Sequence, residues 1–96
     1  MANYVILGNF TDQGIRGIKD TTKRAQAFRD LAKDMGGSIK DIYWTFGAYD
    51  VVLIMEAPDD ETVAATLMKV GSLGNLKSHM LRAFNEDEVN SLISRL

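Results

Sequence analysis

The chain has 96 residues, of which 46% are hydrophobic and 25% are charged, and its formal net charge is −2. These values are typical of one ordinary globular domain, here residues 1–96, and they exclude an intrinsically disordered chain. Because a mildly acidic protein has no overall attraction for phosphate backbones, nucleic acid is not an expected partner.

The sequence has no cysteine and no apolar run long enough for a membrane span, and we expect no secretory signal unless one was removed before residue 1. The absence of cysteine excludes disulfides, thiolate metal sites and a cysteine nucleophile. The longest apolar run, Val51 to Met55, is far shorter than the roughly 20 residues that cross a bilayer. The N-terminal residues enter a strand pattern without a basic segment or a cleavage site. We therefore expect a cytoplasmic protein that does not bind membranes.

The first third of the chain predicts a strand, a loop and a helix. Tyr4 to Phe10 is expected to be a strand with both faces covered, because it contains three consecutive apolar residues and ends in a turn cluster. Residues 13–19 have two glycines and no regular period, so we expect an ordered loop. A helix should begin at Asp20 or Thr21 and end at Gly36. Its apolar stripe is Ala25, Phe28, Leu31, Ala32 and Met35.

A β-hairpin is predicted in the middle of the chain. Ser38 to Phe46 is rich in the aromatic and β-branched residues of a strand. Gly47-Ala48 is expected to form a tight connection to a third strand, Tyr49 to Met55. This strand is apolar on both sides after Asp50. The second strand presents one apolar face, made of Ile42, Trp44 and Phe46.

The last part of the chain predicts helix, strand and helix. Pro58 and the capping residue Asp59 precede a helix whose buried stripe is Val63, Leu67 and Val70. Residues 75–84 alternate loosely and are expected to be the fourth strand. Asn85 and Glu88 have the spacing of a capping box. A final short helix then has its apolar residues at helical spacing: Val89, Leu92, Ile93 and Leu96.

The order of these elements is βαββαβ, followed by a C-terminal helix. This order is typical of the ferredoxin-like α+β fold, a four-stranded antiparallel sheet with two crossover helices on one face. The other face is then uncovered, although the first and third strands are apolar on both sides. Since a monomer rarely exposes so large an apolar patch, we expect a homodimer or a higher oligomer of this chain.

Three segments resemble a known family. Gly47-Ala48-Tyr49-Asp50 is similar to the Gly-x-Tyr-Asp signature of the GYD-domain family. Phe10 to Ile15 resembles its Phe-Thr-x-x-Gly-Ile segment. Gly74 to Ser78 resembles its Gly-Asn-Val-Arg-Thr segment, with Lys77 and Ser78 where Arg and Thr are common. The resemblance spans nearly the whole chain.

The resemblance implies a dimeric α/β barrel, in which two ferredoxin-like protomers pack sheet on sheet. It implies little about function, because proteins of similar fold include cofactor-free monooxygenases, haem-degrading enzymes, isomerases, stress-response proteins and ligand-sensing modules. An argument from fold alone does not choose among them.

Tyr49, Asp50 and His79 are the candidate catalytic residues. A phenol and a carboxylate after the hairpin turn can orient a ligand or relay a proton, and the single histidine is of the residue type most often used as a general base. The alternative for Tyr49 and Asp50 is a structural role in the turn, which we favour. His79 has no second histidine, cysteine or carboxylate cluster beside it, so we expect no metal and no cofactor.

Further polar and aromatic residues are candidates for ligand binding. Gln13 and Asn75 lie in the family-like segments and can donate directional hydrogen bonds, or stabilise turns. Trp44 belongs to an aromatic row that can wall a flat ligand, or pack in a core. Four cations can form an anion-binding rim, or remain solvated: Arg16, Lys19, Lys77 and Arg82.

Two functional interpretations follow. The first is a homo-oligomeric module that binds a small ligand or acts in a stress response. Its partners are then a second copy of the chain and a small molecule. The expected ligand contacts are Gln13, Arg16, Trp44, Tyr49, Asp50, Asn75 and Lys77. The second is a cofactor-independent monooxygenase or isomerase that transfers protons through Tyr49, Asp50 and His79. The two differ in whether these side chains converge on one cavity.

Overall fold

A computed structural model describes all of residues 1–96. The βαββαβ order and the terminal helix that the sequence predicted are confirmed, with one additional short helix near the N-terminus. The elements are β1 (Ala2–Phe10), α1 (Asp12–Arg16), a 3-10 turn (Ile18–Asp20), α2 (Thr21–Asp34), β2 (Ser38–Trp44), β3 (Val51–Ala57), α3 (Asp60–Ser72), β4 (Leu76–Ala83) and α4 (Glu86–Ile93).

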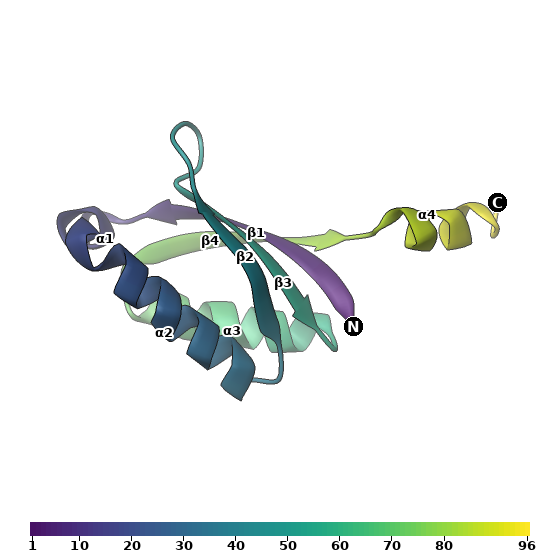
Figure 1. The fold of residues 1–96 in the computed structure, drawn as a ribbon, viewed down its shortest axis with the longest axis horizontal. Coiled ribbons are helices and arrows are strands. Elements are labelled where there is room, and N and C mark those ends of the chain that lie inside the picture. Colours follow the sequence, from purple (N-terminus) through teal and green to yellow (C-terminus); the bar gives the residue numbers. More distant parts are fainter.

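The four strands form one antiparallel sheet in the order β2-β3-β1-β4. Helices α2 and α3 lie side by side against one face of this sheet, and no helix covers the other face (Figure 1). This is the ferredoxin-like arrangement expected from the sequence. None of the helices is both long and apolar enough to cross a bilayer.

The core lies between the sheet and the two helices. Alternate residues of the central strands point toward the helices because successive side chains of a strand point to opposite faces. Tyr4, Ile6, Leu53 and Met55 are almost fully buried in this way, and Val63 of α3 packs in the same cluster. Each apolar side chain of this size contributes about 1.5–3 kcal/mol when it leaves water. Phe28 and Ala32 of the predicted α2 stripe are buried in this core, but Met35, near the end of the helix, is 38% exposed.

The opposite face of the sheet is apolar and open. Val5 of β1 pairs with Ile54 of β3 and with Leu81 of β4, and Leu7 pairs with Val52. These positions alternate with the core residues, so they lie on the face that no helix covers. The predicted two-sided apolarity of the first and third strands is confirmed.

The structure corrects two local expectations. Residues 13–19 were expected to be a loop, but they contain most of α1 and most of the 3-10 turn. The hydroxyl of Thr11 caps α1 by accepting a hydrogen bond from Gly14 N (3.1 Å). A five-residue helix is too short to show a periodic apolar pattern, which is why the sequence did not reveal it.

The hairpin between β2 and β3 is looser than expected. β2 ends at Trp44 and β3 begins at Val51, so Phe46 is not a strand residue and its side chain is fully exposed. Residues 45–50 form a loop instead of a tight two-residue turn. Thr45 closes this loop by donating its backbone N–H to Asp50 O (2.8 Å) and its hydroxyl to Tyr49 O (2.6 Å).

Helix α4 projects away from the rest of the domain (Figure 1). The predicted capping box is present between Asn85 and Glu88. The radius of gyration is 14.3 Å, compared with about 12.5 Å for a compact chain of this length. The apolar side of the final segment is exposed at Val89, Leu92, Ile93 and Leu96.

Candidate functional site

The N-terminal and C-terminal family-like segments meet at one end of the sheet. Thr11 donates its backbone N–H to Asn75 O (3.1 Å) and its hydroxyl to Gly74 O (2.5 Å). Gln13 donates its side-chain N–H groups to Leu73 O (3.0 Å) and to Asn75 Oδ1 (3.0 Å). Residues about 60 positions apart are therefore joined by direct hydrogen bonds, and α1 is fixed against the loop that precedes β4.

Two glycines allow this close approach. A Cβ atom on Gly14 would lie 2.1 Å from Asn75 O, far inside van der Waals contact. Gly74 has a φ of +85°, which side chains rarely tolerate. The two segments therefore fit together only with glycine, or with a shifted backbone.

The third family-like segment attaches to the same end of the sheet through Asp50. Its carboxylate Oδ2 accepts a hydrogen bond from the backbone N–H of Phe10 (2.9 Å), and its own N–H donates to Gly8 O (2.9 Å). These bonds continue the pairing of β1 and β3 beyond the last paired residues, Gly8 and Val51. The carboxylate thus substitutes for a main-chain acceptor.

The side chains of Tyr49 and His79 lie next to each other. Their rings meet edge to face, with centroids 5.9 Å apart and planes at 76°. His79 pairs with Leu7 of β1 and is exposed on the open face of the sheet. None of the three candidate catalytic residues lines either of the two hollows described below, and their catalytic role stays a prediction.

We expect Asp50→Asn to lower the free energy of unfolding by only about 1 kcal/mol, because the amide oxygen can still accept the N–H of Phe10. Asp50→Ala should cost more, since it leaves that N–H without its partner. Urea denaturation of both variants measures the difference. If Asp50 acts as a proton acceptor, Asp50→Asn should instead reduce the activity or affinity for an identified ligand about tenfold or more, at nearly unchanged stability.

An apolar cavity of about 120 Å³ lies between the sheet and the helices. Twelve of its 15 lining residues are hydrophobic. Trp44 forms part of the wall and donates its indole N–H to the hydroxyl of Thr21 at the start of α2 (3.0 Å). The apolar walls include Phe28, Leu31, Ile42, Leu53, Val70 and Leu76.

Arg24 is the one charged residue in the cavity wall. Its guanidinium donates to Gly17 O (2.8 Å) and Gly14 O (2.9 Å), and lies 6.0 Å from the centre of the Phe10 ring. Arg24 was not among the candidates predicted from the sequence. Positions 24, 28, 31 and 35 share one helical face, so a cation within the apolar stripe was a signal that could have found it.

The predicted ligand-binding residues are divided among three places. Trp44 and Asn75 line the cavity. Gln13 and Lys77 line a shallow polar depression outside it, together with Asn9, Phe10, Thr11, Asp12 and Gly74. Tyr49 and Asp50 line neither hollow, and Arg16 is exposed on α1. No group of three histidine or carboxylate side chains is placed to hold a metal ion.

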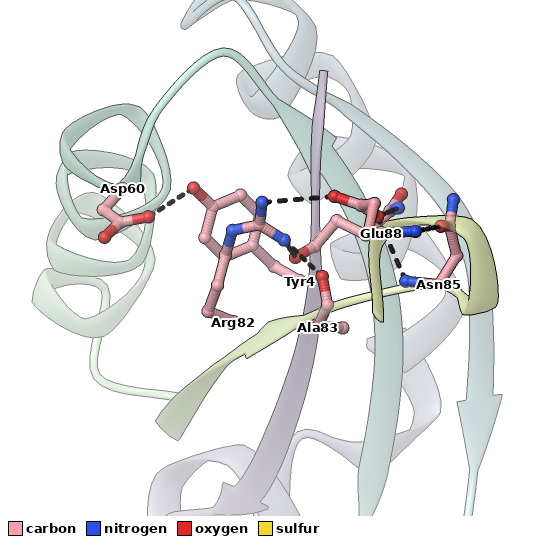
Figure 2. A network of polar contacts seen from close by, with 7 residues as sticks. Tyr4, Asp60, Arg82, Ala83, Asn85 and Glu88 are labelled. Atoms are coloured by element: carbon pink, nitrogen blue, oxygen red, sulfur yellow. Dashed lines mark hydrogen bonds and ion pairs between the residues drawn. The ribbon is translucent and has the colours of Figure 1, made fainter. Parts of the chain in front are cut away.

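Arg82 was a predicted member of the anion-binding rim, but it lies at the opposite end of the sheet from Lys77, in a polar network that the sequence did not reveal (Figure 2). The buried hydroxyl of Tyr4 donates to Asp60 Oδ1 (2.5 Å). Burial, followed by this hydrogen bond to a carboxylate, raises the pKa of Tyr4 to about 12. Tyr4 therefore keeps its proton to higher pH than a free tyrosine, and its hydrogen bond joins β1 to the first turn of α3.

Arg82 connects this network to α4. Its guanidinium lies 5.6 Å from the Tyr4 ring centre and 4.3 Å from that of Phe84, and it pairs with Glu88 (3.5 Å). The backbone N–H of Asn85 donates to Glu88 Oε1 (3.0 Å), and this hydrogen bond is the main reason that the pKa of Glu88 is lowered. The first turn of α4 is thus fixed to β4 and β1.

The fold and these contacts define an α+β domain of ferredoxin-like topology. The chain belongs to the GYD domain family, whose model matches residues 4–93. The resemblance suggested by the three segments is therefore confirmed.

One relative and two solved structures place the chain further. It is 31% identical over 97 residues to the glutamine synthetase and cystathionine beta-lyase binding protein of Thermus thermophilus, covering 100% of this chain and 99% of that protein. The crystal structure of TTHA0845, also from Thermus thermophilus, has a TM-score of 0.57 at 20% identity, covering 88% of this chain and 95% of that one.

The crystal structure of MtbAldR has a TM-score of 0.68 at 16% identity. The match covers 88% of this chain and 52% of MtbAldR, so this chain spans about half the length of that protein. At these identities both structural similarities show the fold alone.

Proposed function

We propose that this protein is a small homo-oligomeric binding module, in which a second copy covers the open face of the sheet and the assembly binds a small ligand and a larger protein. The observation that carries the proposal is the apolar open face, where Leu81 remains 46% exposed in the single chain. Patches of this kind normally mark an interface. A stress-related role and a cytoplasmic location, expected from the sequence, belong to the same proposal.

Light scattering tests the assembly. We expect at least a dimer for the wild-type protein at micromolar concentration, and dissociation toward the 10.6 kDa monomer for Leu81→Glu, because the new charge would be buried at the interface. Met68→Glu, on the outer side of α3 and 77% exposed, is the matched control and should keep the wild-type mass. A wild-type monomer at this concentration would contradict the proposal.

The proposed protein partner is an enzyme of amino-acid metabolism. The full-length similarity to a protein named for binding glutamine synthetase and cystathionine beta-lyase supports this part of the proposal. Immobilised purified glutamine synthetase and cystathionine beta-lyase should each be tested for saturable binding of this chain. If neither enzyme binds a preparation that forms the expected oligomer, the proposed protein partner is contradicted and the proposed oligomer is not affected.

The small-ligand part of the proposal involves the predicted residues that line a hollow. Trp44 and Asn75 support it at the cavity, and Gln13 and Lys77 support it at the outer depression. The cofactor-independent enzyme has less support, because Tyr49, Asp50 and His79 line neither hollow.

A further inference from the structure

The size of the cavity limits what it can bind. Its volume is about 120 Å³ and most of its lining is aliphatic or aromatic. An apolar protein cavity of about 150 Å³ stays dry and binds benzene. The cavity beneath α2 is therefore in the size class of one aromatic ring, and any further part of a ligand would have to extend through its open side.

The charge of the cavity wall adds a second limit. The two ion pairs of the chain join Lys40 to Glu56 and Arg82 to Glu88, so Arg24 has no carboxylate partner. Arg24 is nevertheless only partly exposed. A cation that is partly removed from water gains from a nearby anion, and arginine is suited to the planar, two-oxygen geometry of a carboxylate.

The Arg24 guanidinium is held in place by two hydrogen bonds and still has N–H groups that are free to donate. Its two bonds to Gly14 O and Gly17 O use one N–H on each terminal nitrogen, while a guanidinium has five N–H groups. Those bonds fix the charged group at the cavity without neutralising it. Asn75, in the same wall, accepts the bond from Gln13 at Oδ1, so its amide nitrogen is the group it can offer to a ligand.

We propose that this cavity binds a small carboxylate with one aromatic ring, with the ring among the apolar walls and the carboxylate paired with Arg24. The inference rests on the small-ligand part of the proposed function and names its site and chemical class. It is independent of the open sheet face, because the cavity lies on the helix side of the sheet.

Trp44 is the only tryptophan and lies in the cavity wall, so its fluorescence reports directly on occupancy. Benzoate is the probe, and toluene and acetate supply its ring and its carboxylate separately. We expect benzoate to change the Trp44 emission saturably and to bind at least tenfold more tightly than either fragment. A response to acetate equal to that of benzoate, or no saturable response to benzoate, would overturn the proposal.

Two variants test the geometry. Arg24→Gln can still donate to a backbone carbonyl but lacks the charge, so it should weaken benzoate binding about tenfold or more and leave toluene unchanged. Arg29→Gln, exposed on the same helix, is the matched control and should bind benzoate as the wild type does. Equal benzoate affinity in Arg24→Gln and wild type would overturn the role of Arg24.

Ala25→Leu, in the cavity wall, should abolish the response to both benzoate and toluene by filling the space. If a variant fails to fold, as judged by circular dichroism, the comparison of the three probes on the wild-type protein still decides. Light scattering on the same samples distinguishes failure of the ligand site from failure of the assembly. An oligomer that does not bind benzoate overturns the ligand site alone. A monomer that binds benzoate supports the ligand site and contradicts the proposed oligomer.

Discussion

Leu53→Asp should abolish the stable fold. Leu53 is 1% exposed and pairs with Ile6 of β1 and Ile42 of β2, so an aspartate there would be a buried charge without a partner. We expect a loss of about 4 kcal/mol or more, comparable to the whole stability of a small domain. Urea denaturation followed by circular dichroism and by Trp44 fluorescence measures it.

The control for this substitution is Met68→Asp, which introduces the same side chain at a residue that is 77% exposed on α3. It should cost less than about 1 kcal/mol, mainly through helix propensity. Both variants should be compared at the same protein concentration, because association shifts apparent stability. A cooperative transition of Leu53→Asp near the wild-type midpoint would show that β3 is not the central strand described here.

Gly14→Ala should destabilise the protein by about 2–4 kcal/mol, although it adds only one methyl group. The new Cβ would lie 2.1 Å from Asn75 O, and a backbone oxygen cannot turn aside as a side chain can. Relief of this clash requires α1 to move, which breaks the bond from Thr11 N to Asn75 O and strains the contacts of Gln13. Thermal denaturation should show a fall of several degrees per kcal/mol.

Gly71→Ala is the control with the opposite expected sign. Gly71 lies in α3, no atom lies within 4 Å of the position that a Cβ would take, and its φ is not positive. Alanine is favoured over glycine in a helix by about 1 kcal/mol, so this variant should be stabilised. If Gly14→Ala were as stable as Gly71→Ala, the close approach of α1 to the loop before β4 would be wrong.

The elements with strong periodicity could be predicted from the sequence. The apolar stripe of α2, the capping residue Asp59 and the capping box of Asn85 and Glu88 are local signals, and each is present in the structure. The uncovered apolar face also followed from local pattern, because alternation in β1 and β3 assigns each residue to a face. The short α1 and the loop ends of β2 and β3 were placed wrongly, and β1 and β3 each extend two residues beyond their predicted outer ends, to Ala2 and Ala57.

The partners of the polar residues could not be predicted, because they are joined across the chain. Gln13 contacts Asn75 at a separation of 62 residues, and Tyr4 contacts Asp60 at a separation of 56. No periodicity encodes which pairs meet. The sequence thus identified Gln13, Trp44, Asn75 and Lys77 as candidates without showing that they belong to two different hollows.

The bond between Asp50 and the main chain of Phe10 has a consequence for how the family signature is used. The Asp50 carboxylate is used in a hydrogen bond to the main chain, so its presence indicates how this segment folds. In this chain the tetrapeptide joins two strands at one end of the sheet, and none of its residues lines the cavity between the sheet and the helices. We therefore seek the specificity of the proposed ligand site at Arg24 and its neighbours in the cavity wall.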